Sequence, residues 1–125
     1  MGHNILIVDD SAIVRAVIER ALRLSGVALG DLYHAGDGKA ALELLEMHAV
    51  DLVFADLNMP VMDGVTMIGE MESRGMLART SVVVVSTDRS EVRMRELKAH
   101  GVREYLNKPF TPESIRDTVE RCLSS

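Results

Sequence analysis

The sequence predicts a doubly wound α/β fold, with five parallel strands in the order 2-1-3-4-5 and helices on both faces of the sheet. Apolar runs at residues 5–8, 52–55 and 82–85 have no polar interruption, which is typical of strands buried on both faces. Segments with apolar residues at helical spacing separate the strands, and this alternation implies a parallel sheet with right-handed crossovers. The order 2-1-3-4-5 is a common doubly wound order and places the three apolar runs at the centre. The more polar segments at 31–35 and 102–106 are then edge strands.

The first half of the chain predicts two units of strand and helix. After the strand at 5–8, Ser11 can cap a helix that runs to Leu24. Residues 26–30 predict a loop before the edge strand at 31–35, and Asp37 can cap the helix that follows. The first helix is expected to place Val14, Val17, Ile18, Ala21 and Leu24 on its inner face and Arg15, Glu19, Arg20 and Arg23 on the opposite face.

The second half repeats this pattern three times. Pro60 prevents the central strand from continuing, and Asp63 can cap a helix that ends at Gly75. The strand at 82–85 is followed by a helix at about 90–100 with a thin apolar stripe, and such weak burial is typical of an element that can shift. Thr111 can cap the last helix, with Pro112 in its first turn.

Size and composition narrow the class of protein. A chain of 125 residues fits one domain, and a net charge of -5 argues against a nucleic-acid partner. The single cysteine, Cys122, has no internal disulfide partner, and no stretch reaches the roughly 18 apolar residues of a membrane span. The first residues lack a basic region and a cleavage site, so we expect a cytoplasmic protein without membrane insertion.

Acidic residues follow two of the central strands. Asp9 and Asp10 come after the first strand and Asp56 after the third, and the carboxyl ends of neighbouring parallel strands meet at one rim of the sheet. Ionised carboxylates at about 4 Å repel by about 4 kcal/mol per pair at an effective dielectric of about 20, so the site needs cations. Lys108, which follows the fifth strand, supplies one of these cations. The hard oxygen ligands, including the backbone carbonyl of Asn58, favour Mg²⁺ or Mn²⁺ as the second cation.

Charge balance leaves Asp56 available as a nucleophile. With a divalent ion and Lys108 present, the charges of the three acids sum to zero, so Asp56 can attack a phosphoryl group and become an acyl phosphate. The added negative charge would attract the hydroxyl of Ser86 at the neighbouring strand end. Movement of Ser86 would pull on the loop at 86–90 and let the ring of Tyr105 turn from an exposed to a buried rotamer.

Together these motifs resemble those of the receiver domain of two-component response regulators, and most closely the stand-alone, chemotaxis-type receivers. The resemblance covers essentially the whole chain, so residues 1–125 are expected to form a single receiver domain with the flavodoxin-like (CheY-like) fold. The matching residues are Asp9 and Asp10, Asp56 in DLNMPVMDG, Ser86 after VVVV, Tyr105, and Lys108 in KPF, which resembles the family's cis Lys-Pro peptide.

The resemblance implies a phosphorylation switch. Asp56 would be phosphorylated with Mg²⁺ by a histidine kinase or a small acyl phosphate and would slowly lose its phosphoryl group. Output would come from a protein target, not identified by the sequence, that binds the face of the fourth helix, fifth strand and fifth helix. The chain is then expected to act as a monomer and to catalyse only its own phosphorylation and dephosphorylation.

One position departs from the family's pattern. Thr87 follows the switch hydroxyl, where the family usually has a small residue, and we expect its bulk to narrow access to Asp56 and to slow small phosphodonors. Asn58 and Asp88 are expected to flank the path of the hydrolytic water and to set the lifetime of the phosphorylated state.

Other functions remain open from the sequence. The chain could be a phosphorelay intermediate that passes its phosphoryl group to a histidine phosphotransferase, or a piece of a larger response regulator or hybrid kinase. A metal-dependent phosphohydrolase commonly has an acid two residues after its nucleophile, where this chain has Asn58. A flavin mononucleotide carrier would need a phosphate-binding loop after the first strand, where the acids of DDSA would repel phosphate.

Overall fold

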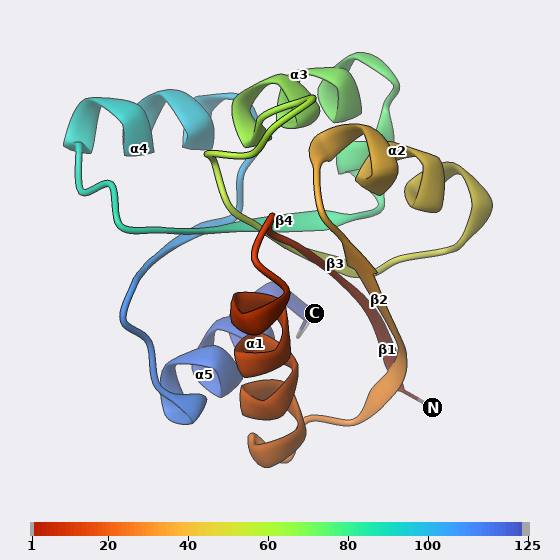
Figure 1. The fold of residues 1–125 in the computed structure, drawn as a ribbon, viewed down its shortest axis with the longest axis vertical. Helices are drawn as coiled ribbons and strands as arrows, with labels where there is room; N and C mark the ends of the chain where they lie inside the picture. The colour runs from red at the N-terminus through yellow and green to blue at the C-terminus, as the bar shows by residue number, and fades with distance from the viewer. Residues whose placement is uncertain (1, 124–125) are drawn as a thin grey trace.

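Five strands form one parallel sheet in the order β2-β1-β3-β4-β5 in the computed structural model, which describes residues 2–123 (Figure 1). The order and the parallel pairing confirm the predicted fold, with the three apolar runs in the central strands and the polar strands at the edges. The strands are β1 (His3–Val8), β2 (Leu29–Ala35), β3 (Leu52–Ala55), β4 (Ser81–Ser86) and β5 (Glu104–Asn107).

Helices cover both faces of the sheet. Figure 1 shows α1 and α5 on one face and α2, α3 and α4 on the other. Each helix in residues 2–123 falls short of the length and hydropathy that a membrane span requires. The helices are α1 (Ala12–Leu24), α2 (Gly38–Met47), α3 (Gly64–Ser73), α4 (Glu91–Ala99) and α5 (Pro112–Leu123), with a short 3₁₀ turn, η1 (Met76–Ala78), before β4.

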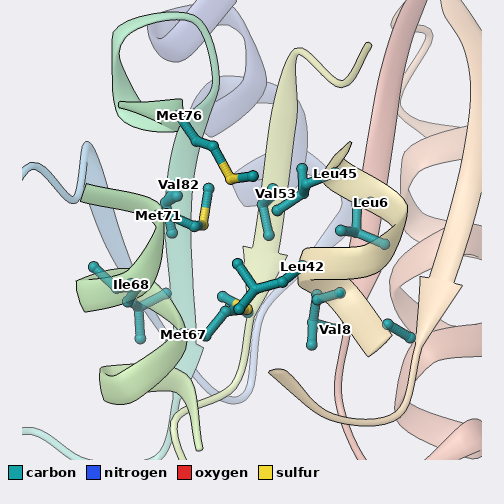
Figure 2. Packing of buried hydrophobic residues seen from close by; sticks show 14 of the residues in the cluster. Leu6, Val8, Leu42, Leu45, Val53, Met67, Ile68, Met71, Met76 and Val82 are labelled. Carbon is teal, nitrogen blue, oxygen red and sulfur yellow. The ribbon is translucent and has the colours of Figure 1, made fainter. Parts of the chain in front are cut away.

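Successive side chains of a strand point to opposite faces, so the central strands feed two separate cores. Ile5, Ile7 and Phe54 pack toward α1 and α5, whereas Leu6 and Val53 pack toward α2 and α3. Figure 2 shows the second core, in which strand residues meet apolar side chains of α2, α3 and η1. Each fully buried aliphatic side chain contributes about 1.5–3 kcal/mol, so these cores hold the strand ends, and the loops after them, in fixed positions.

The helices begin where the sequence places capping residues. In each case a side-chain oxygen accepts a hydrogen bond from a backbone N–H in the first turn, which typically contributes about 1 kcal/mol. The capping residues are Ser11, Asp37, Asp63 and Thr111, as predicted, and Ser90 at the start of α4.

The inner face of α1 differs from the prediction. Val17 and Leu24 are 50% and 64% exposed, and Leu22 is fully buried in their place. The helix rests on the sheet and on α5 through a narrow stripe, so apolar residues at the margins of the predicted face remain in water.

Two strand boundaries also differ. β2 begins at Leu29 rather than 31, because the β1–β2 register shifts between His3 and Ile5 and the Asn4 side chain accepts a hydrogen bond from the Asp31 N–H at 2.8 Å. β5 begins two residues after the predicted position, because the N–H of Val102 bonds to the last turn of α4.

Candidate functional site

Three carboxylates gather at the carboxyl ends of β1 and β3. Asp9, Asp10 and Asp56 each offer an oxygen, and these oxygens lie within 4.8 Å of one another. The arrangement follows from strand pairing, because Val8 is paired with Ala55 and the next residues are therefore neighbours. Asp9 is 2% exposed, Asp56 is half-buried and Asp10 is open to solvent.

Lys108 places an ammonium group between two of these acids. Its Nζ lies 3.3 Å from Asp9 Oδ2 and 3.9 Å from Asp56 Oδ2. The Lys108 N–H bonds to the carbonyl of Ser86 at 3.0 Å, which restrains the backbone at this position. The peptide between Lys108 and Pro109 is cis. The residue after the edge strand thus reaches back over the central strands.

The carboxyl group of Asp56 is held in an unfavourable environment for a charge. Burial raises its pKa, the nearby ammonium of Lys108 lowers it, and the charge of Asp9 raises it again. The backbone N–H groups of Leu57 and Asn58 lower the pKa further by donating to the carboxylate. Because burial dominates, the ionised form would gain from a second cation beside it.

The oxygens of this cluster fit a hard divalent cation. Three carboxylates and one ammonium leave a formal charge of -2, which a divalent ion would balance. The cluster contains carboxylate oxygens and no histidine or cysteine, a donor set that suits Mg²⁺ or Mn²⁺ and not zinc. Asp9 and Asp10, with Asp56, are therefore the residues that could hold the metal.

The loop after β3 turns sharply to leave Asp56 at the rim. Val61 has φ 66°, a left-handed conformation that is strained for a β-branched residue, and the Met62 N–H bonds to the Pro60 carbonyl at 2.7 Å. Gly64 packs so closely that a Cβ there would lie 2.2 Å from the backbone oxygen of Asp56. Only glycine fits this approach, so the loop and the start of α3 fix the backbone of Asp56.

A second group of predicted residues lies at the end of β4 and is joined by hydrogen bonds. Ser86 is 1% exposed, and its Oγ accepts a hydrogen bond from the Asp88 N–H at 3.1 Å. The hydroxyl of Tyr105 donates to the Asp88 carbonyl at 2.7 Å, and the Asp88 carboxylate accepts from the Ser90 N–H at 2.9 Å. The side chain of Tyr105 is half-buried, and its hydroxyl is bonded to this loop. Its turn from an exposed to a buried rotamer stays a prediction.

The remaining predicted residues lie on the surface. Thr87 and Asn58 are exposed. Thr87 follows Ser86 directly, and Asn58 comes two residues after Asp56. The structure thus brings Asp9, Asp10, Asp56 and Lys108 into one cluster and joins Ser86, Asp88 and Tyr105 in a neighbouring one.

Arg15 was missed by reasoning from the sequence. The helical pattern placed it on the face of α1 away from the core, but it is half-buried, and its Nη1 donates to the Asp9 carbonyl at 2.5 Å. Side chains of a helix lean toward its N-terminus, so an arginine in the second turn can reach the end of the preceding strand. That rule was the available signal.

Known proteins resemble this chain along nearly its full length. Residues 5–120 match the family model of the response regulator receiver domain. Chemotaxis protein CheY of Bacillus subtilis is 30% identical over 124 residues, which is 99% of this chain and 100% of that protein. Transcriptional regulatory protein PdtaR of Mycobacterium tuberculosis is 34% identical over 123 residues, 98% of this chain but 57% of that protein. The solved structure of chemotaxis protein CheY4 of Vibrio cholerae aligns with a TM-score of 0.87 at 30% identity, over 98% of this chain and 100% of that one.

Proposed function

Because the chain belongs to the response regulator receiver domain family, whose members are signalling proteins of two-component systems, we propose that it is switched by Mg²⁺-dependent phosphorylation of Asp56. The observation that carries the proposal is the cluster itself, in which Asp56 shares an acidic rim with Asp9 and Asp10 and lies 3.9 Å from the ammonium of Lys108. The phosphodonor is a histidine kinase or histidine phosphotransferase, or a small acyl phosphate.

The chemistry needs a nucleophile and positive charge around the phosphoryl group. An oxygen of Asp56 forms a bond to phosphorus while the bond from phosphorus to the donor nitrogen or oxygen breaks, and the electron pair leaves with the donor. Lys108 stabilises negative charge on the transferred oxygens. Asp9, Asp10 and Asp56, with the backbone carbonyl of Asn58, would hold Mg²⁺, which when bound neutralises charge on the same oxygens.

Phosphorylation changes the charge that the neighbouring loop faces. A phosphorylated carboxylate carries about two negative charges where Asp56 carries one, so it attracts the Ser86 hydroxyl. Movement of Ser86 disturbs its bond to the Asp88 N–H, and Asp88 is in turn bonded to Tyr105. The charge change is thereby passed to β5 and to the loop before α4.

The output face is formed by α4, β5 and α5. Among the nine residues of α4, Leu97 alone is fully buried, so this helix can shift at little cost in packing. The exposed bases Arg95 and Lys98 lie on the same helix and are available to a protein target. Thr87, Asn58 and Asp88 would set the rates of phosphorylation and hydrolysis.

A cytoplasmic monomer without activity on other substrates fits this role. A second role is supported by one comparison: PdtaR matches this chain over 57% of its own length, so receivers of this kind also occur within longer proteins. The chain could then serve as the receiver part of a larger regulator, or pass its phosphoryl group to a histidine phosphotransferase.

Incubation with acetyl phosphate and Mg²⁺, followed by intact-mass spectrometry, tests the proposed chemistry. We expect one adduct of about 80 Da on the wild type. The adduct should be absent in Asp56→Asn and when a chelator removes the metal. An adduct that survives Asp56→Asn would contradict the proposal, and so would hydrolysis of many acetyl phosphate molecules per minute without a phosphoprotein.

A further inference from the structure

Arg15 joins the first turns of α1 to the acidic rim. Its Nη1 donates to the backbone carbonyl of Asp9, and its Nε is buried without a hydrogen-bond partner in residues 2–123. The same Nη1 lies beside Gly36, 3.8 Å from where a Cβ would stand at that position. The guanidinium group therefore lies across the carboxyl ends of β1 and β2.

This position is unfavourable for the arginine alone. An arginine on a helix surface can satisfy its N–H groups with water, whereas Arg15 leaves one of them unpaired inside the protein. What it gains is a charge-assisted hydrogen bond to a single carbonyl, that of the peptide between Asp9 and Asp10. The contact restricts the orientation of that peptide.

The two acids on either side of the peptide differ in how they are held. The Asp9 carboxylate is fixed by the Ser11 N–H at 2.9 Å and by Lys108 Nζ at 3.3 Å. The Asp10 carboxylate is exposed and has no hydrogen-bond partner within the described part of the chain. Its direction therefore depends on the backbone that carries it.

We propose that Arg15 is a positioning residue of the metal site: by fixing the peptide between Asp9 and Asp10, it keeps the Asp10 carboxylate directed toward Asp9 and Asp56. The inference rests on the proposed function, because it takes the acidic cluster to be the Mg²⁺ site. Arg15 acts through the backbone and makes no contact with the ion.

Charge and positioning have opposite effects on Mg²⁺ binding. If Arg15 acted only as a nearby positive charge, its neutralisation would make the rim more negative and strengthen the binding of a cation. If it positions Asp10, its loss weakens binding, as the loss of groups that orient metal ligands typically does by about 10- to 100-fold. Whether the loss of Arg15 raises or lowers the affinity for Mg²⁺ therefore distinguishes a charge effect from a positioning role.

The experiment compares Mg²⁺ affinity in the wild type, Arg15→Gln, Arg15→Lys and Arg20→Gln. Arg20 is an exposed arginine on the same helix, so its substitution is matched in charge and residue type. Titration of MgCl₂ followed by ¹H–¹⁵N NMR gives each dissociation constant, and urea unfolding in the presence of a chelator reports the stability of the fold without metal. We expect Mg²⁺ to bind Arg15→Gln about 10- to 100-fold more weakly and Arg20→Gln as it binds the wild type.

Arg15→Lys keeps the positive charge and can still donate to the Asp9 carbonyl, but without the planar guanidinium group, so its affinity for Mg²⁺ should lie between those of Arg15→Gln and the wild type. It also carries the test if Arg15→Gln does not fold. If Arg15→Gln folds and binds Mg²⁺ as tightly as the wild type or more tightly, the positioning role is overturned. If Arg15→Gln does not fold, equal or tighter Mg²⁺ binding by Arg15→Lys overturns it. Failure of the wild type to bind Mg²⁺ would instead overturn the proposed function.

Discussion

Replacing Asp56 with asparagine should stabilise the metal-free protein and destabilise the metal-bound one relative to the wild type. In the absence of metal, Asp56 lies with Asp9 and Asp10 within 4.8 Å, where each pair of charges repels by about 3.5 kcal/mol at an effective dielectric of about 20. Lys108 at 3.9 Å offsets about 4 kcal/mol of this. Asparagine removes two repulsions and one attraction, a net gain of about 3 kcal/mol before solvent screening at the exposed Asp10.

With that screening we expect a gain of about 1–2 kcal/mol in the free energy of unfolding at neutral pH, or roughly 4 °C in Tm per kcal/mol. The gain should depend on pH in a defined direction. Burial raises the pKa of Asp56 in the folded state, so the fold favours the protonated carboxyl. The contribution of the protonated carboxyl to stability is complete at pH values below its ordinary pKa of 3.8. It is lost as the pH rises through the raised pKa of the folded state. The advantage of the variant should therefore be largest near neutral pH and disappear in acid.

Magnesium should reverse the order of stability. An ion that binds only the folded wild type adds about 2.7 kcal/mol to the free energy of unfolding when its concentration is about 100 times the dissociation constant. The variant lacks one of the carboxylates that would bind the ion. Urea unfolding followed by circular dichroism, with chelator and with Mg²⁺, measures both effects. Glu43→Gln, which removes an exposed acid from α2, is the charge control. It should show neither the gain in stability in chelator nor the reversal in Mg²⁺. If Asp56→Asn is no more stable than the wild type in chelator at neutral pH, the repulsion argued for this cluster is wrong.

Three further substitutions test the loops around the site. Thr87→Ala should speed phosphorylation of Asp56 by acetyl phosphate severalfold, since it removes bulk next to Ser86 and widens the proposed access to Asp56. An unchanged rate in a mass-spectrometric time course would exclude that role for Thr87. Val61→Gly should stabilise the fold by about 1 kcal/mol, because φ 66° is strained for valine and the side chain is 79% exposed. Equal urea midpoints would show that the strain is no larger than the unfolded-state entropy that glycine adds. Tyr105→Phe removes the hydrogen bond to the Asp88 carbonyl and should lower the free energy of unfolding by about 1 kcal/mol. It should also speed amide hydrogen exchange in the loop at 86–90, and unchanged exchange would show that Tyr105 does not hold this loop.

The fold could be predicted because its determinants are local in the sequence. Uninterrupted apolar runs identify buried parallel strands, and the topology then brings the residues after β1 and β3 to one rim. For this reason the cluster of Asp9, Asp10 and Asp56 could be expected from the sequence alone. Lys108 could be expected at the same rim, but its approach to Asp9 and Asp56 depends on a side chain that extends past β4.

Other features depend on packing that no pattern in the sequence reports. The guanidinium of Arg15 bonds to the Asp9 carbonyl because its side chain leans toward the N-terminus of α1, whereas the periodicity of α1 alone places it on the opposite face. The side chain of Asn4 compensates for the register shift in β1, so β2 extends further than its composition suggests. The bond between Tyr105 and Asp88 joins residues 17 positions apart through the position of a loop.

The central claim is that the charge on Asp56 controls the face formed by α4, β5 and α5. The most direct measurement is a ¹H–¹⁵N NMR map of the wild type with Mg²⁺, before and after addition of beryllofluoride as a mimic of the phosphoryl group. The account predicts shifts at Asp56 and its neighbours together with changes through residues 86–107, none of which should occur in Asp56→Asn. Shifts confined to the rim, with residues 86–107 unchanged, would contradict it.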